Sequence, residues 1–139
     1  MSIVSRNFIN FEELPVIRSL SLNSPEKLKN EKFVYLTTKG RKSGKDHEVE
    51  LWFAHSNGKI YLSHEGEYTD WIRNLLKDSN VRMKIGGEVI QGQAKIAING
   101  SAEREDGMRA LYEKYYGPAT KEALEDWFEL SAVIEINPK

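Results

Sequence analysis

A short stretch in the first half of the chain, TTKGRKSGKDHEVEL, combines four cations with two glycines. The cations are Lys39, Arg41, Lys42 and Lys45, and the glycines are Gly40 and Gly44. A glycine-bearing loop lets backbone N–H groups converge on an anion, and the arginine fork matches the geometry of a phosphate. The stretch contains neither a Walker A order nor a dinucleotide-binding fingerprint. Residue types alone favour a phosphate-binding loop and a solvated lysine-rich hairpin about equally.

Two histidines are candidates for a further polar site. His47 begins one predicted strand and His64 ends the next, so hairpin pairing would bring both imidazoles to one end of a sheet. Two imidazoles without a third ligand at diagnostic spacing make a weak metal site, and the chain has no cysteine to add thiolate ligands. We therefore expect no metal, and interpret both as surface or ligand-contacting residues.

Aromatic side chains offer flat apolar surface on which a planar ring can stack. Trp71 lies in a predicted helix over residues 68–77 and is such a candidate. Tyr112 and Tyr115 recur at helical spacing with Met108, which indicates that most of this stripe faces the core. The acidic residues between 122 and 129 are most simply a solvated helix face.

The elements that position these residues are predicted from their periodicity. Strands are predicted over 32–38, 47–54, 59–64, 81–85, 88–98 and 130–136, and helices over 68–77, 108–115 and 122–129. Asn57-Gly58 and Gly86-Gly87 are hairpin turn signals, so the sheet should be mainly antiparallel. Six strands with few helices suit a small barrel, because closure hides the edges of an open sheet.

Length and composition set the remaining expectations. The chain has 139 residues, of which 40% are hydrophobic; we predict one domain over 31–139, preceded by an arm or short helix over 1–30. Twenty Lys and Arg against 21 Asp and Glu give a net charge of −1, which disfavours a nucleic-acid partner. No apolar run approaches the roughly 20 residues of a membrane span, and we expect a cytoplasmic protein.

Three segments together carry a more specific pattern: VYLTTKGRKSGK, NGKIYL and DWIRNLLKDSNVRMKIGGE. Their combined spacing of Thr-Thr-x-Gly-Arg-Lys-Ser-Gly, Trp-x-x-Asn-Leu and Gly-Gly-Glu resembles the deazaflavin-dependent nitroreductase family, a branch of the flavin- and deazaflavin-binding split β-barrel oxidoreductases. The resemblance is clear over about residues 33–97 and looser over the C-terminal helix–helix–strand part.

The resemblance implies a fold and an activity. The fold is a six-stranded antiparallel split β-barrel of the FMN-binding type, with a few flanking helices and often dimeric. The activity is hydride transfer between reduced deazaflavin and a small organic acceptor such as a quinone, an enone or a nitro compound. The implied cofactor is the deazaflavin coenzyme F-420, with FMN as the alternative. An FMN-dependent oxidase or reductase, and a non-catalytic carrier of such a cofactor, remain the alternative functions.

The resemblance also implies which residues hold the cofactor. The charged loop would hold its phosphate and tail, and the Trp-x-x-Asn helix would lie beside it. The expected cofactor-binding residues are Thr38, Gly40, Arg41, Lys42, Ser43, Gly44, His47, Ser63, His64, Trp71 and Asn74. His64 stands where the family has a lysine and His47 where it commonly has an arginine, which removes two fixed cations and leaves deazaflavin and FMN both open. No catalytic residue is assigned.

Overall fold

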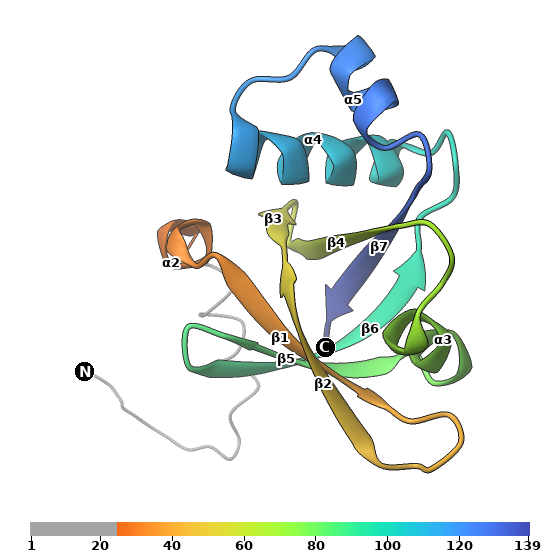
Figure 1. The fold of residues 1–139 in the computed structure, drawn as a ribbon. Helices are drawn as coiled ribbons and strands as arrows, with labels where there is room; N and C mark the ends of the chain where they lie inside the picture. The colour runs from red at the N-terminus through yellow and green to blue at the C-terminus, as the bar shows by residue number, and fades with distance from the viewer. Residues whose placement is uncertain (1–24) are drawn as a thin grey trace, which may run out of the picture.

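The computed structural model describes residues 25–139 (Figure 1). The elements in chain order are α2 (Pro25–Asn30), β1 (Phe33–Lys39), β2 (Asp46–Trp52), β3 (Ala54–Ser56), β4 (Lys59–Glu65), α3 (Asp70–Lys77), β5 (Asn80–Ile85), β6 (Glu88–Ile96), α4 (Ala102–Tyr116), α5 (Lys121–Trp127) and β7 (Ser131–Pro138). Of the predicted arm over 1–30, only α2 falls within the described residues. The predicted mainly antiparallel α+β class is confirmed, because every strand pair is antiparallel.

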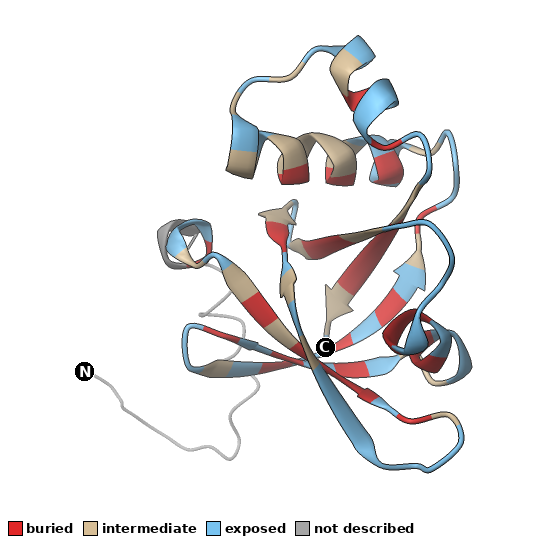
Figure 2. Ribbon diagram, viewed as in Figure 1, coloured by how far each residue is buried: buried red, intermediate tan, exposed pale blue. Residues whose placement is uncertain are grey.

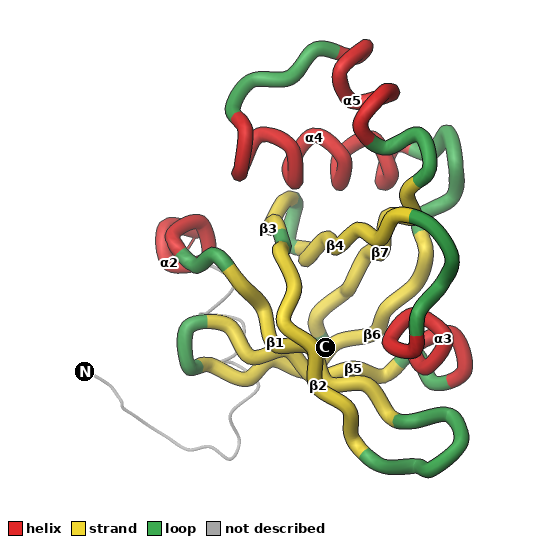
Figure 3. Tube along the Cα trace, viewed as in Figure 1, coloured by secondary structure: helices red, strands yellow, loops and turns green. Residues whose placement is uncertain are grey.

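The sheet closes on itself through one continuous stretch of chain. Its strand order is β2-β1-β5-β6-β7-β4-β3, so β2 and β3 lie at opposite ends of the order although Phe53 alone separates them in sequence. Such a chain requires the sheet to curl until its two ends meet, as Figure 3 shows. The structure therefore has seven strands rather than six, because the predicted strand over 47–54 is interrupted where it passes from one end of the sheet to the other.

A tyrosine from α4 satisfies the backbone at this interruption. The Phe53 N–H donates to the Tyr115 hydroxyl at 2.9 Å, and that hydroxyl lies 2.8 Å from the carbonyl oxygens of both Phe53 and Lys32. Backbone groups that leave a strand ladder need other partners, since an unpaired buried N–H or C=O is costly. Tyr115 thus acts at the strand break and does not simply fill the core.

We expect Tyr115→Phe to lower the free energy of unfolding by about 2 kcal/mol, because the Phe53 backbone loses its partner. Urea denaturation followed by circular dichroism measures the change. Tyr112→Phe is the matched control, because it also removes a hydroxyl from α4. Within residues 25–139, the Tyr112 hydroxyl makes no hydrogen bond, unlike that of Tyr115. Equal stability of the two variants would contradict this role for Tyr115.

Two hydrophobic cores hold the fold together (Figure 2). The first fills the barrel and includes Val34, Leu36, Ile60, Leu62, Met83 and Ile134. The second lies where α4 and α5 cover the outer face of β4 and β7, and includes Tyr61, Leu111, Leu124, Phe128 and Val133. Residues on β4 and β7 serve both cores because successive side chains of a strand point to opposite faces.

Two glycines permit close approaches in these cores. A Cβ at Gly92 of β6 would lie 2.6 Å from Cγ2 of Ile136 and 3.3 Å from the Asn137 carbonyl oxygen, so β7 approaches closely at this glycine. A Cβ at Gly107 of α4 would lie 2.6 Å from Cδ1 of Tyr61 and 2.9 Å from Cγ1 of Val133. Gly107 therefore sets how closely α4 packs on the sheet.

Within residues 25–139, no helix combines the length and the apolar character that a membrane span requires. The cytoplasmic location and the homodimer expected from the sequence stay predictions.

Candidate functional site

The charged loop connects β1 and β2. Thr38 pairs with His47 at the ends of these strands, so the hairpin register brings two predicted site residues side by side. The loop is closed by hydrogen bonds from the Gly40 N–H to the Lys45 carbonyl at 2.7 Å and from the Gly44 N–H to the Gly40 carbonyl at 2.9 Å. Gly44 has a φ of 72°, which favours glycine at that position.

A buried asparagine from α3 fixes this loop. Asn74 is 2% exposed; its Nδ2 donates to Oγ1 of Thr38 at 3.2 Å, and its Oδ1 accepts from the Arg41 backbone N–H at 3.1 Å and from Arg41 Nη1 at 3.0 Å. One amide therefore links β1, the loop and α3, and its acceptor and donor are both used. The structure supports a positioning role for Asn74 toward the loop.

Arg41 is also paired with an acid that the sequence analysis did not select. Its Nη2 lies 3.2 Å from Oδ1 of Asp70, the first residue of α3. The side chain of Asp70 is 83% exposed. An acid in the first turn of a helix is ordinary, because it interacts favourably with the positive end of the helix dipole. The sequence therefore carried no signal that Asp70 belongs to the site.

These residues line a cavity of about 240 Å³, which we call the loop pocket. Its lining residues are Gly40, Arg41, Lys42, Ser43, His47, Asp70 and Asn74. The side chains of His47 and Ser43 approach Gly40 closely: a Cβ there would lie 2.7 Å from Nε2 of His47 and 2.8 Å from Oγ of Ser43. The structure thus gathers six of the eleven predicted site residues around one space.

The loop pocket holds donors without partners. Among the described residues, the backbone N–H groups of Lys42 and Ser43 make no hydrogen bond, and the Lys42 ammonium makes no ion pair. The N-cap Thr69 leaves the first turn of α3 without a side-chain cap, and that positive helix end carries the pocket residue Asp70. Free N–H groups, a free ammonium and an arginine fork fit a phosphate group.

The other predicted residues lie elsewhere. Thr38 is 1% exposed and lies beneath Asn74, and Gly44 shapes the turn of the loop. Ser63 pairs with Val133 in the β4–β7 ladder, away from the loop pocket lining.

His64 and Trp71 contact each other instead of the loop pocket. His64 Nε2 donates to the Glu67 carbonyl at 2.7 Å, and its ring meets the Trp71 ring edge-on with centroids 6.1 Å apart. Trp71 is only 7% exposed and packs in the barrel core, which leaves it little surface for stacking. Contacts of Ser63, His64 and Trp71 with a cofactor stay predictions.

An exposed group of aromatic side chains lies at the other end of β2. The ring of Trp52 stacks on that of Tyr115 with centroids 4.1 Å apart, and the rings of Tyr116 and Trp127 meet edge-on with centroids 4.9 Å apart. Trp52, Tyr116 and Trp127 are 43%, 50% and 54% exposed, and we call these three with Tyr112 the aromatic patch. The sequence analysis did not select Trp52, whose side chain points away from the face of β2 that carries Val49 and Leu51.

A family model described as F420H(2)-dependent quinone reductase matches residues 14–121. No curated protein sequence gives a significant match.

Three solved structures share the fold. The conserved hypothetical protein Rv2991 from Mycobacterium tuberculosis superposes with a TM-score of 0.70 at 20% identity, over 84% of this chain and 79% of that one. An F420-H2 Dependent Reductase (FDR-A) superposes with a TM-score of 0.61 at 22% identity, over 78% of this chain and 94% of that one. A putative pyridoxamine 5′-phosphate oxidase from Listeria innocua superposes with a TM-score of 0.60 at 15% identity, over 88% of this chain and 94% of that one. These identities support the split-barrel fold alone.

Proposed function

The chain belongs to the F420H(2)-dependent quinone reductase family, and from that premise we propose that it transfers a hydride from the reduced deazaflavin to a small organic acceptor such as a quinone, an enone or a nitro compound. Membership in this family confirms the predicted class, a deazaflavin-dependent oxidoreductase, and the predicted cofactor. The observation that carries the proposal is the loop pocket, whose unpaired donors suit the phosphate of such a cofactor.

The residues of the loop pocket bind and orient. The Lys42 ammonium and the N–H groups of Lys42 and Ser43 would hold the phosphate, while Asn74 keeps the Arg41 fork aimed at it. When bound, the reduced deazaflavin supplies the hydride, and the acceptor takes up one proton from water to complete its reduction.

The aromatic patch lies apart from the loop pocket. His47 in the loop pocket and Trp52 in the aromatic patch lie five residues apart on β2, which corresponds to roughly 17 Å along an extended strand. Residues an odd number apart on a strand point to opposite faces, so the loop pocket and the aromatic patch are two separate surfaces.

The test is anaerobic turnover. The full chain is mixed with the reduced deazaflavin coenzyme and, in separate reactions, with a quinone, an enone and a nitroaromatic compound, while the absorbance of the oxidised coenzyme is followed. Reduced FMN replaces the deazaflavin in a parallel series. Catalytic turnover with the deazaflavin supports the proposal. Stoichiometric binding without turnover of any acceptor would indicate a carrier, and turnover with FMN alone would indicate a flavin enzyme.

Asp70 should weaken cofactor binding, because its carboxylate competes with the phosphate for Arg41. We expect Asp70→Asn to tighten binding up to about fivefold, since exposed ion pairs contribute roughly 0.2–1 kcal/mol. Fluorescence titration of the coenzyme measures the dissociation constant. Asp126→Asn on α5 is the control, because it makes the same charge change outside the lining of the loop pocket. Weaker binding in Asp70→Asn would contradict this competition.

A further inference from the structure

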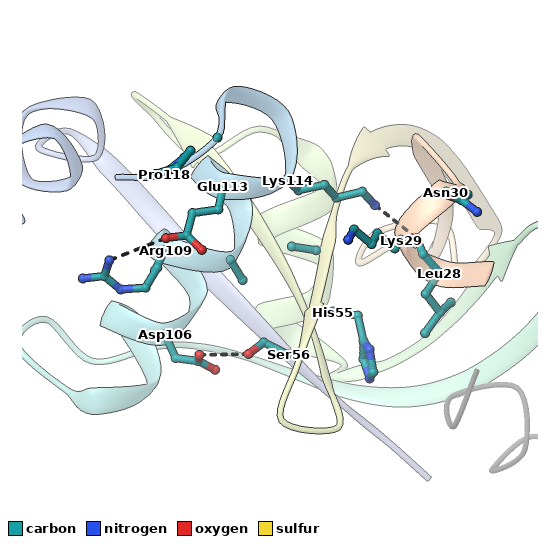
Figure 4. A pocket seen from close by; sticks show the side chains of 13 residues that line it. Leu28, Lys29, Asn30, His55, Ser56, Asp106, Arg109, Glu113, Lys114 and Pro118 are labelled. Carbon is teal, nitrogen blue, oxygen red and sulfur yellow. Dashed lines mark hydrogen bonds and ion pairs between the residues drawn. The ribbon is translucent and has the colours of Figure 1, made fainter. Parts of the chain in front are cut away.

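A separate cavity of about 710 Å³ lies between α2, β3 and α4 (Figure 4). It shares no lining residue with the loop pocket. Its volume is within the range of small-molecule sites, and its apolar walls come from Leu28, Ala54, Ala110 and Pro118. We call it the α4 cavity.

One wall of the α4 cavity carries a lysine without an acidic partner. Lys114 Nζ donates to the Leu28 carbonyl at 3.3 Å and lies 3.5 Å from the centroid of the Phe53 ring, and among the described residues no carboxylate lies within ion-pair distance of it. Burial lowers the pKa of Lys114 to about 8, against a smaller opposing effect of the Glu31 charge. An ammonium that is half-buried and unpaired destabilises the folded state.

A histidine on β3 has a buried polar atom without a partner in this region. Nε2 of His55 is buried and has no hydrogen-bond partner in the part of the chain that the structure describes. Burial, and then the charge of Lys114, lower the pKa of His55, so the imidazole is neutral near pH 7. Buried polar atoms normally have partners, and an exception suggests a missing ligand or water.

The two acids of the cavity wall already have partners among the described residues. The Ser56 hydroxyl donates to Oδ1 of Asp106 at 2.9 Å, and Oε2 of Glu113 forms an ion pair with Nη1 of Arg109 at 3.7 Å (Figure 4). Asp106 also accepts a hydrogen bond from Asn57 at 3.2 Å. The cations Lys29, Arg109 and Lys114 outnumber these two acids on the cavity wall, so the net formal charge that a ligand would meet is positive.

We propose that the α4 cavity binds a small organic anion, a carboxylate with an apolar body, whose carboxylate pairs with Lys114. The apolar body would lie against Leu28, Ala110 and Pro118, and the carboxylate would provide the negative charge that the ammonium lacks among the described residues. Lys114 is half-buried whereas Lys29 is exposed, so the buried part of the wall offers a single positive charge, which suits a singly charged carboxylate better than a doubly charged phosphate. This inference does not depend on the proposed reductase activity.

Benzoate is the probe, and benzamide is its uncharged match in shape. In calorimetric titration of the full chain we expect benzoate to bind with a dissociation constant below roughly 1 mM and benzamide to bind at least about tenfold more weakly, because only the anion forms a charge-assisted bond. Lys114→Gln should weaken benzoate binding at least about tenfold. Lys121→Gln on α5 and Lys42→Ala in the loop pocket should leave it unchanged.

The pH dependence gives an independent readout. His55 from β3 and Glu31 after α2 interact electrostatically with Lys114, and Lys29 from α2 and Glu113 on its own helix line the same cavity. A bound carboxylate favours the protonated ammonium, so benzoate affinity should be greatest below pH 8 and fall as pH rises further. Lys114→Gln should remove this fall.

Each outcome decides the proposal. Tighter binding of benzoate than benzamide, lost in Lys114→Gln and retained in Lys121→Gln, supports it. Thermal unfolding of Lys114→Gln checks that the variant is folded. Absence of benzoate binding at millimolar concentration, equal binding of benzamide, or an unchanged affinity in folded Lys114→Gln would overturn it, whatever the result of the turnover assay.

Discussion

Replacing Arg41 and Lys42 together by alanine should weaken binding of the deazaflavin coenzyme by at least about a hundredfold. A charge-assisted hydrogen bond contributes roughly 1.5–3 kcal/mol, and the double variant removes two cationic partners of the phosphate. The single variants should differ. Lys42→Ala removes an ammonium that has no partner among the described residues, whereas Arg41→Ala also removes the bonds to Asn74 and Asp70 that hold the loop on α3.

Fluorescence titration of the coenzyme measures these affinities, and thermal unfolding separates lost contacts from lost structure. Lys42→Ala should keep the melting temperature of the unmodified chain, while Arg41→Ala should lower it. Lys45→Ala is the matched control, since it removes a cation from the same loop at a position that does not line the loop pocket. Unchanged affinity in the double variant would show that the phosphate binds elsewhere and would contradict the proposed role of the loop.

Gly107→Val should destabilise the fold by about 3 kcal/mol, because the new side chain has no space where α4 packs on the sheet. The first added carbon would already lie 2.6 Å from the ring of Tyr61 and 2.9 Å from Val133, both buried. Either α4 must move away from β4 and β7 or these side chains must leave their positions in the second core.

Urea denaturation gives the free energy of unfolding of this variant. Ala102→Val, at the exposed start of the same helix, is the control for the lower helix propensity of valine. We expect that variant to lose well under 1 kcal/mol. A Gly107→Val protein as stable as Ala102→Val would mean that α4 does not approach the sheet as closely as the structure has it.

The sequence by itself determined the local elements and the charged loop. The Asn57-Gly58 hairpin forms with φ values of 52° and 76°, Gly86-Gly87 turns β5 into β6, and Gly117 ends α4 with a φ of 93°. Each depends on residues adjacent in the chain, so a short window of sequence contains its cause. The loop pocket was largely predictable for the same reason, because most of its residues belong to one continuous stretch.

Only the tertiary structure decided which distant side chains meet. Asn74 and Asp70 contact Arg41 across about 30 residues of chain, and the Tyr115 hydroxyl meets the backbone of Phe53, 62 residues away. The Phe53 interruption turned one predicted strand into two, because the curl of the sheet, not the alternation of side chains, sets where pairing changes. A local sequence pattern indicates which face of a helix or strand is apolar. It does not indicate which polar groups of other elements come within hydrogen-bond distance of that helix or strand, because those distances are set by how the elements pack together.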